Sequence, residues 1–474
     1  MGDQAAEGRS IPAAAAADPP GGEARRRRQR WGWYAYAWGS HSFETSVITV
    51  FMSRYLPAVA KNAVGANGRL HILGIPIAPG SLFAYVVSFC AIVLVFLMPI
   101  MGAVADRTGR KRELILGFGY LGALSCAAMW FITRTNWALG VGLLVAAYIS
   151  YTCAKVVLNS MLADLADADD RDKVSSVGWA SGYVGGGLLL AVSFVGSFFI
   201  TDSELLARLS LSAAGIWWAL FAIIPLFLLR NAPRNAHQRE RIQGGVLLAG
   251  FRELGSTFRN ARHFPMTLLF LIAYLVYYDG ITTVTTLSAD YGQEELRLGS
   301  NTLLTAILIV QFAAFGGALL LGRLAQVWGA KRVIAGSLVV WIGVVGAAYF
   351  VQAGAVFQFY ALALVLSIVL GGSQALSRSL YSSLVPAGKE AEYFSVYEIS
   401  SSGSSALGPL LFGLTLQNTG SYREAILSLV VFFIVGLGLL LPLNLRRAVE
   451  AAGNVLPASM AGRNEPRPAA EPVI

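Results

Sequence analysis

Residues 102–112 read GAVADRTGRKR and separate two long apolar runs, residues 81–100 and 113–132. Each run is about as long as the 20 mostly apolar residues that a membrane-spanning helix needs. The stretch between them carries one acid, Asp106, and four cations, Arg107, Arg110, Lys111 and Arg112. Under the positive-inside rule, a short cationic loop between two such helices faces the cytoplasm. We therefore expect this loop to set the orientation of the whole chain.

The overall composition also indicates a membrane protein. Of the 474 residues, 55% are hydrophobic and only 13% are charged, whereas soluble domains carry roughly a quarter charged residues. The net charge is +9, but the cations gather in short segments between apolar runs, which suits anionic lipid better than nucleic acid. Cys90, Cys126 and Cys153 lie in separate apolar runs without a CxxC pair, so we expect buried packing residues.

Hydropathy predicts an all-α polytopic membrane protein with about twelve spanning helices. The expected spans are residues 33–56, 81–104, 113–133, 137–163, 174–200, 210–230, 264–289, 301–324, 332–352, 356–384, 393–418 and 422–445. They form two six-helix bundles, 31–230 and 264–446, with disordered tails at 1–30 and 447–474. An even number of spans and the cation-rich inner segments predict that both termini are cytoplasmic. Short loops and the lack of a cleavage signal favour a bacterial plasma membrane.

The linker at residues 231–263 divides the two bundles. Within it, Val246, Leu247, Phe251, Leu254 and Phe258 recur at helical spacing beside arginines. This pattern predicts an amphipathic helix on the inner membrane surface. A plain solvated linker is the alternative.

The 102–112 stretch has a second copy half a chain later. Residues 322–332 read GRLAQVWGAKR, which aligns both glycines and the Lys-Arg pair of the first copy, with Gln326 in place of Asp106. An internal duplication after the second helix of each half is typical of transporters built from two parallel repeats. We expect the second loop to have the weaker charge network, because its acid is missing.

The first loop resembles the cytoplasmic signature of the major facilitator superfamily. The signature is complete at Gly102, Asp106, Arg107, Gly109, Arg110, Lys111 and Arg112. Residues 177–190, 273–284, 311–332, 371–380 and 408–414 further resemble the vacuole-effluxer, autophagy-related branch, and the chain resembles a bacterial-type member of it. The resemblance implies a major facilitator fold and secondary transport, and the best-known eukaryotic members of the branch export amino acids. Residues 36–40, YAWGS, depart from the Tyr-Asp-Trp-Ala-Asn pattern usual there.

Ionisable side chains inside apolar helices cost about 2.5–3.5 kcal/mol on insertion scales and are functional candidates. The candidates are His41, Glu44, Lys155, Asn159, Tyr277, Tyr278, Asp279, Gln374, Arg378 and Glu398. Except for Glu398, in the expected eleventh helix, they lie in helices one, four, seven and ten. The resemblance implies that these four helices line a central cavity.

We hypothesise that Lys155 and Arg378 meet an anionic group, while Glu44 or Asp279 meets a cationic group or carries a proton. Protons are then the candidate coupling ion, and mixed charges suit a zwitterion such as an amino acid. Sugars and drugs are the other substrate classes. Glu44 and Lys155 could instead form an ion pair that only fixes packing, and Arg378 could extend to the membrane surface.

Acids and a cation also follow the fourth helix, where the resemblance suggests that Asp164 and Arg171 join Asp106 in an inner charge network. The enzyme alternative for this loop is the Mg²⁺–pyrophosphate site of a membrane prenyltransferase, which needs a second acidic cluster that the sequence lacks. The chain also has no Walker-type or HExxH motif. We therefore expect no enzyme activity, cofactor or metal; the partners are a small-molecule substrate and the lipid bilayer. A non-transporting membrane receptor is the remaining alternative.

Overall fold

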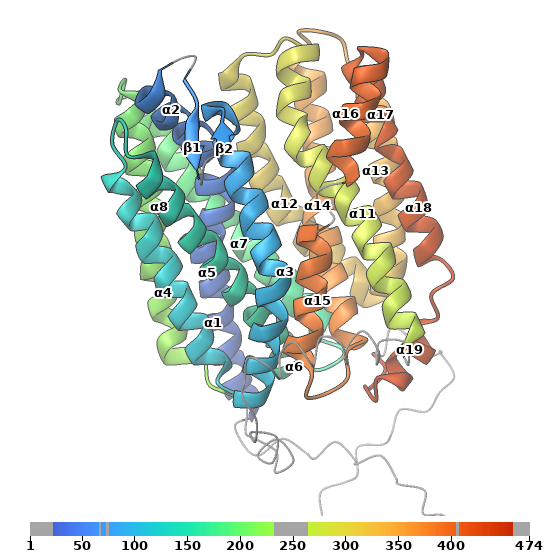
Figure 1. The fold of residues 1–474 in the computed structure, drawn as a ribbon. Coiled ribbons are helices and arrows are strands. Elements are labelled where there is room, and N and C mark those ends of the chain that lie inside the picture. Colours follow the sequence, from blue (N-terminus) through green and yellow to red (C-terminus); the bar gives the residue numbers. More distant parts are fainter. Residues whose placement is uncertain (1–21, 66–67, 73–74, 232–263, 404–406, 458–474) are drawn as a thin grey trace, which may run out of the picture.

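The computed structural model describes residues 22–65, 68–72, 75–231, 264–403 and 407–457. In Figure 1 the N-terminal half, blue to green, and the C-terminal half, yellow to red, stand side by side as bundles of long helices. Within this described part, ten helices are long and apolar enough to cross a membrane. They are α3 (Leu82–Thr108), α4 (Lys111–Ala128), α5 (Trp137–Ser160), α7 (Arg171–Gly196), α8 (Ser203–Leu228), α11 (Pro265–Asp290), α12 (Ser300–Trp328), α13 (Ala330–Ala348), α14 (Val356–Ser383) and the pair α17 (Tyr422–Ser428) and α18 (Val430–Leu440).

Two further passes are each described in more than one segment. The first comprises α1 (Gly22–Ser42), the π-helical segment η1 (Phe43–Met52) and α2 (Ser53–Val64). The eleventh comprises α15 (Glu390–Gly403) and α16 (Leu407–Thr419), and residues 404–406 lie outside the described part. With the ten helices above, they make two sets of six.

Short elements connect these passes. The β1 (Leu70–Ile72) and β2 (Ile75–Ile77) strands form an antiparallel pair in which Leu70 lies opposite Ile77. Single 3₁₀ turns, η2 (Pro79–Ser81) and η3 (Met129–Phe131), flank α3 and α4, and α6 (Leu162–Leu165) follows α5. A π-helical turn, η5 (Tyr291–Glu295), extends α11.

The first helix begins earlier than the sequence predicts, at Gly22 rather than after a disordered segment 1–30. Two arginines of this extension bind the end of α6 and the loop that follows it. The Arg26 guanidinium lies 2.8 Å from Asp167, and Arg30 donates to the Leu165 carbonyl and to Asp170. The prediction of disorder for residues 22–30 is therefore wrong.

The C-terminal boundary differs in the same way. Helix α19 (Leu445–Ala451) continues past residue 446, capped by the Asn444 side chain, and buries Ala448 and Val449. Asn454 donates to the Ser383 and Val385 carbonyls at the end of α14, which ties the segment to the bundle. The expected amphipathic helix, with Val246 to Phe258, lies outside the described residues.

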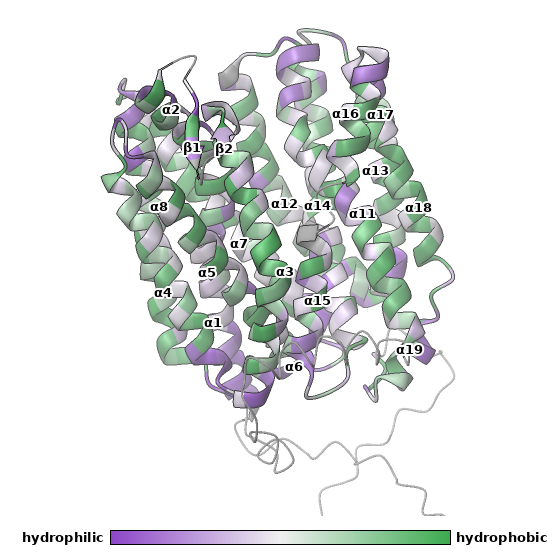
Figure 2. Cartoon of the chain, in the orientation of Figure 1, coloured by the Kyte–Doolittle hydropathy of each residue, from purple (hydrophilic) through white to green (hydrophobic). Residues whose placement is uncertain are grey.

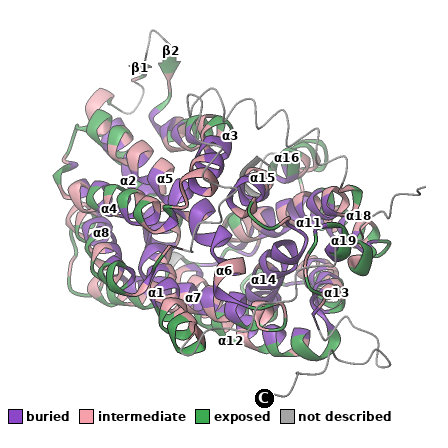
Figure 3. Ribbon diagram, turned by 90° about the horizontal axis from the view of Figure 1, so that it is seen from below, coloured by how far each residue is buried: buried purple, intermediate pink, exposed green. Residues whose placement is uncertain are grey.

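Apolar residues dominate the middle of the bundle and polar ones its two ends (Figure 2). Viewed along the helices, buried positions face the interior of each half (Figure 3). Trp33 and Trp218 belong to the core of the N-terminal half, and Trp341 stacks on Phe433 in the other core. Large apolar side chains such as Phe357, 84% exposed, point outward. Such side chains suit a lipid surface, which does not penalise exposed apolar groups.

We call the end that carries the 102–112 loop, at the bottom of Figure 1, the motif end. Near it, helix α3 of the N-terminal half packs against α15 of the C-terminal half. Helix α7 packs against α12 and α14. The main contacts between the two halves are therefore those of α7 with α12 and α14 and those of α3 and α5 with α15, and these contacts decide which side of the bundle is closed.

Candidate transport site

A cavity of about 610 Å³ lies between the halves. Its walls come from α1–α2, α7 and the parts of α11 to α14 far from the motif end. Lining it are the exposed residues Arg54 and Asp290, so the cavity reaches solvent at the end opposite the motif. Polar and charged residues of its lining include His41, Glu44, Thr45, Thr49, Tyr183, Gln311 and Gln374.

Glu44 lies in the first turn of the π-helical segment and lines the cavity. Its carboxylate oxygens lie 3.0 Å from the Lys155 ammonium and 3.6 Å from His41 Nδ1. The Thr49 hydroxyl donates to the Glu44 backbone carbonyl at 2.8 Å. The Glu44 side chain is 34% exposed, so solutes in the cavity can reach it.

Lys155 extends the cluster into the other half. Its ammonium lies 3.7 Å from Glu398, whose side chain is only 3% exposed. Asn159 donates to the same carboxylate at 2.7 Å and accepts from Arg378 at 3.0 Å. The structure thus brings together six of the predicted residues, two of them from the C-terminal half. The Glu44–Lys155 ion pair considered above is present, but it is part of a larger mixed-charge cluster.

The remaining candidates are distributed around this cluster. Gln374 lines the cavity and accepts from the Tyr183 hydroxyl of the N-terminal half. Tyr277 shares a hydrogen bond of 2.6 Å with Ser377, and Tyr278 packs on Tyr274. These contacts make the two tyrosines part of the wall behind the site.

Asp279 lies elsewhere. Its side chain is fully buried, and its carboxylate accepts from the Gly408 N–H at 2.8 Å and from Thr283 at 3.5 Å. It therefore joins α11 to the start of α16 and does not belong to the Glu44 cluster. An acid at a helix N-terminus is stabilised by the free amides there.

The predicted signature loop closes the motif end. Gly109 adopts φ 61°, the left-handed conformation that ends α3 and favours glycine. The Asp106 carboxylate accepts from the backbone N–H groups of Ala391 and Glu392, at 3.1 and 2.8 Å. It thereby caps the first turn of α15, across the boundary between the halves.

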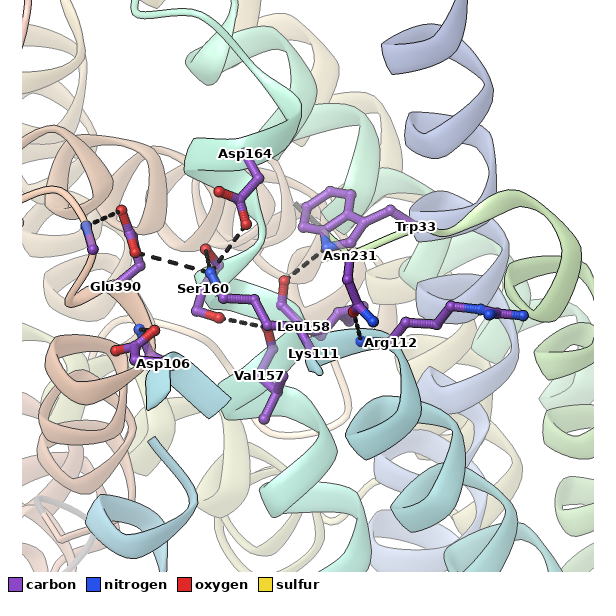
Figure 4. A network of polar contacts seen from close by, with 12 residues as sticks. Trp33, Asp106, Lys111, Arg112, Val157, Leu158, Ser160, Asp164, Asn231 and Glu390 are labelled. Carbon is purple, nitrogen blue, oxygen red and sulfur yellow. Dashed lines mark hydrogen bonds and ion pairs between the residues drawn. The ribbon is translucent and has the colours of Figure 1, made fainter. Parts of the chain in front are cut away.

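Lys111 is the centre of the ion pairs in this loop (Figure 4). Its ammonium lies 3.0 Å from Asp164 and 3.9 Å from Glu390, and it reaches the Ser160 carbonyl. Asp164 is therefore linked to the signature through Lys111. The described hydrogen bonds of Asp106 go to α15.

The arginines of the network have separate positions. Arg171 donates to the Ser382 carbonyl of α14 at 3.0 Å, a further bond between the halves. Arg112 is held by Asn231 and the Leu226 carbonyl at the end of α8. Arg107 lies in the last turn of α3, and Arg110 is exposed before α4.

The second loop also has a glycine of positive φ between its helices, and it lacks the acid contact. Gly329 has φ 81°, and Lys331 donates to the Leu441 and Leu443 carbonyls within its own half. Gln326 is exposed. Both copies therefore need a glycine at this position, but they differ in its ψ, 12° at Gly109 and 142° at Gly329, and in the contacts their side chains make.

Several residues of the site were not expected from sequence. Trp179 and Tyr183 line the cavity, Gln311 donates to Thr45 at 2.6 Å, and Glu390 pairs with Lys111. Trp179 and Tyr183 are four apart on the glycine-rich face of α7, a spacing that could have indicated one polar-aromatic stripe. Nothing in the sequence around Glu390 distinguishes it.

Solved transporters share this arrangement. The proton:xylose symporter XylE aligns with a TM-score of 0.63 at 17% identity, over 88% of this chain and 94% of that one. The Escherichia coli fucose:proton symporter FucP aligns with a TM-score of 0.64 at 14% identity, over 88% of this chain and 98% of that one. A bacterial homologue of the iron transporter ferroportin, in its outward-facing state, aligns with a TM-score of 0.58 at 14% identity, over 88% of this chain and 98% of that one. The fold is that of major facilitator transporters, as predicted.

Residues 25–453 match the family described as "Vacuole effluxer Atg22 like", and the chain belongs to this family. The "Uncharacterized MFS-type transporter YxiO" of Bacillus subtilis is 30% identical over 418 residues, 86% of this chain and 93% of that protein. "Autophagy-related protein 22" of Saccharomyces cerevisiae is 25% identical over 503 residues, 90% and 94%. The protein is thus an integral membrane transporter of the MFS type, and the predictions of family and non-enzyme class are confirmed.

Proposed function

We propose that the protein is a secondary transporter of a small solute, with amino acids as the leading class, that works by alternating access. The observation that carries the proposal is a cavity that reaches one end of the bundle and ends on a mixed-charge cluster shared by both halves. The opposite side of that cluster is closed by contacts between α3 and α15 and between α7 and α14.

The motif end is the cytoplasmic end in this proposal. Its support is the concentration of cations there, from the 22–30 segment of α1 to the 102–112 loop. The cavity then faces outward, the state in which the ferroportin homologue and FucP have been solved. Both termini lie in the cytoplasm, and the bacterial plasma membrane is the proposed location.

The walls of the cavity support a solute with both charges and an apolar part. Glu44 offers an acceptor for an ammonium group beside the Lys155 cation. On the side of the C-terminal half, Val310, Leu366 and Leu370 form an apolar wall. The family description, vacuole effluxer, supports export as the direction.

Protons are the proposed coupling ion, and Glu44 the proposed carrier. The carboxylate reaches cavity solvent and pairs with a cation that can move to Glu398, whereas Asp279 is enclosed by backbone contacts. XylE and FucP, which share the fold, are proton symporters by description.

Purified protein in proteoliposomes tests the proposal. A mixture of labelled standard amino acids is offered with and without a pH gradient, and the labelled amino acids that accumulate inside the vesicles are identified as substrates. Glu44→Gln should abolish the gradient-dependent part, and Glu294→Gln, an exposed acid beyond α11, should not. Full gradient-dependent uptake in Glu44→Gln would rule out Glu44 as the carrier. Thermal stabilisation without flux would indicate a binding protein.

A further inference from the structure

Arg378 belongs to the C-terminal half, but the described hydrogen bonds of its guanidinium all go to the N-terminal half. Nε and Nη2 donate to the hydroxyl and carbonyl of Ser175, at 2.9 and 2.7 Å. Nη1 donates to Asn159 Oδ1 at 3.0 Å. The residue is 5% exposed. The guanidinium therefore lies inside the opposite half and does not extend to the membrane surface.

Two indole rings complete this binding place, which we call the Arg378 socket: Trp33, Asn159, Ser175, Gly178 and Trp179. The guanidinium carbon lies 4.7 Å from the centre of Trp33 and 5.5 Å from that of Trp179. Trp33 is itself fixed by a 2.8 Å bond from its indole N–H to the Leu158 carbonyl. A Cβ at position 178 would approach Trp33 to 2.2 Å and Arg378 Nη2 to 3.1 Å, so only glycine leaves room. Such a fork-shaped, stacked environment suits arginine and not lysine.

The socket is connected to the cavity by a continuous chain of polar contacts. From the cavity, the chain runs through Glu44, Lys155, Glu398 and Asn159 to Arg378. The Asn159 amide donates to Glu398 and accepts from Arg378, so both of its ends are used. Because Lys155 lies between two carboxylates, loss of the Glu44 charge releases it toward Glu398 and perturbs the bond from Asn159.

We propose that Arg378 is the latch of the motif end, and that the charge state of Glu44 operates it through Lys155, Glu398 and Asn159. This inference rests on the proposed alternating access. To open the motif end, α14 must move away from α5 and α7, and Arg378 must leave a socket built entirely on the other half. The neighbouring bonds from Ser175 to the Ala375 carbonyl and from Arg171 to the Ser382 carbonyl break in the same motion.

The latch is tested by distance measurements that need no transport. Spin labels at Lys173→Cys and Ala387→Cys, exposed residues of the two halves near the motif end, are introduced after the three buried cysteines are replaced by serine or alanine. Arg378→Lys keeps the charge, and Ser175→Ala removes one acceptor as a milder variant. Either should raise the long-distance population about tenfold, the factor that corresponds to ~1.4 kcal/mol. Arg423→Lys, whose partners lie within the C-terminal half, is the matched control.

An unchanged distance distribution in folded Arg378→Lys and Ser175→Ala protein would overturn the latch. The operation from the cavity is tested by a double-mutant cycle. Glu44→Gln should lengthen the Lys173–Ala387 distance in the native background and have no further effect with Asn159→Leu. Equal shifts in both backgrounds would overturn the link through Asn159. Failure of uptake with an intact latch would count against the proposed transport alone.

Discussion

At the scale of single residues, the charges of the site balance one another. Lys155 lies between Glu44 and Glu398, and Arg378 adds a second cation through Asn159. Two acids and two bases leave the buried cluster neutral, which limits the cost of holding it within the membrane. Removing the charge of one member leaves an unpaired charge in the cluster.

Lys155→Met should therefore be strongly destabilising. Breaking a buried pair costs about 3–5 kcal/mol, because the remaining carboxylates lose their cation. The thermal unfolding temperature of the purified protein measures the effect. Lys173→Met, an exposed lysine on α7, should lie within about 0.5 kcal/mol of the native protein. Equal unfolding temperatures for the two variants would show that Lys155 is not structurally required.

Asp106→Asn should weaken closure of the motif end more than Gln326→Ala does. The carboxylate accepts two N–H groups at the start of α15, and hydrogen bonds to a charged group contribute about 1.5–3 kcal/mol. Gln326 is exposed and serves as the control. Maximal transport rate should fall for Asp106→Asn while substrate affinity stays nearly unchanged. The asymmetry is disproved if both variants slow transport equally.

The sequence predicts site residues well when they are charged side chains inside apolar helices, because the free-energy cost of placing such a charge in a membrane indicates a function. Glu44, Lys155 and Arg378 are of this kind. The contact made by Asp279 could not be predicted, because its partner, the Gly408 amide, lies 129 residues further along the chain in another helix. The Arg378 socket was also hidden, since Trp33 and Ser175 are unremarkable until the two halves meet.

At the scale of elements, close backbone approach decides how well the motif end closes. Gly102 of α3 lies against α15, where a Cβ would be 2.5 Å from the Ala391 carbonyl oxygen. The Ala391 oxygen belongs to the backbone of α15, and a Cβ would be fixed to the backbone of α3. The two helices would therefore have to move apart to make room. Close packing of α3 against α15 therefore explains why this position of the signature, which lies within α3, is a glycine.

Gly102→Ala should force α3 and α15 apart and favour opening of the motif end. Overpacking of this kind costs typically about 1–3 kcal/mol. The Lys173–Ala387 label pair measures the change, with Gly117→Ala as control because a Cβ there meets no atom within 4 Å. A native distance distribution in Gly102→Ala would mean that the interface adapts without opening.

The same scale shows where hydropathy predicts helices well and where it does not. The ten uniformly apolar spans agree closely with their predicted ranges. The first pass contains a π-helical segment and extends further toward the N-terminus than predicted. Hydropathy reveals neither the π-helical turns nor the pairing of Arg26 with the loop after α6.

At the scale of the whole molecule, the internal repeat gives two similar halves with unequal contacts. The N-terminal half supplies the signature acid and the Arg378 socket, and the C-terminal half supplies the helix end and the arginine that they hold. Both sets of contacts close the motif end and leave the cavity open at the other. Alternating access requires that they break together.

Side-specific labelling of one cavity residue tests this account most directly. Thr49 lines the cavity and is exposed, so Thr49→Cys can react with a membrane-impermeant maleimide. We predict rapid reaction from the side opposite the motif end and slow reaction from the motif side, with this preference reversed by Arg378→Lys. Equal reaction from both sides would contradict a transporter that opens to one side at a time, and a preference that Arg378→Lys leaves unchanged would contradict the latch.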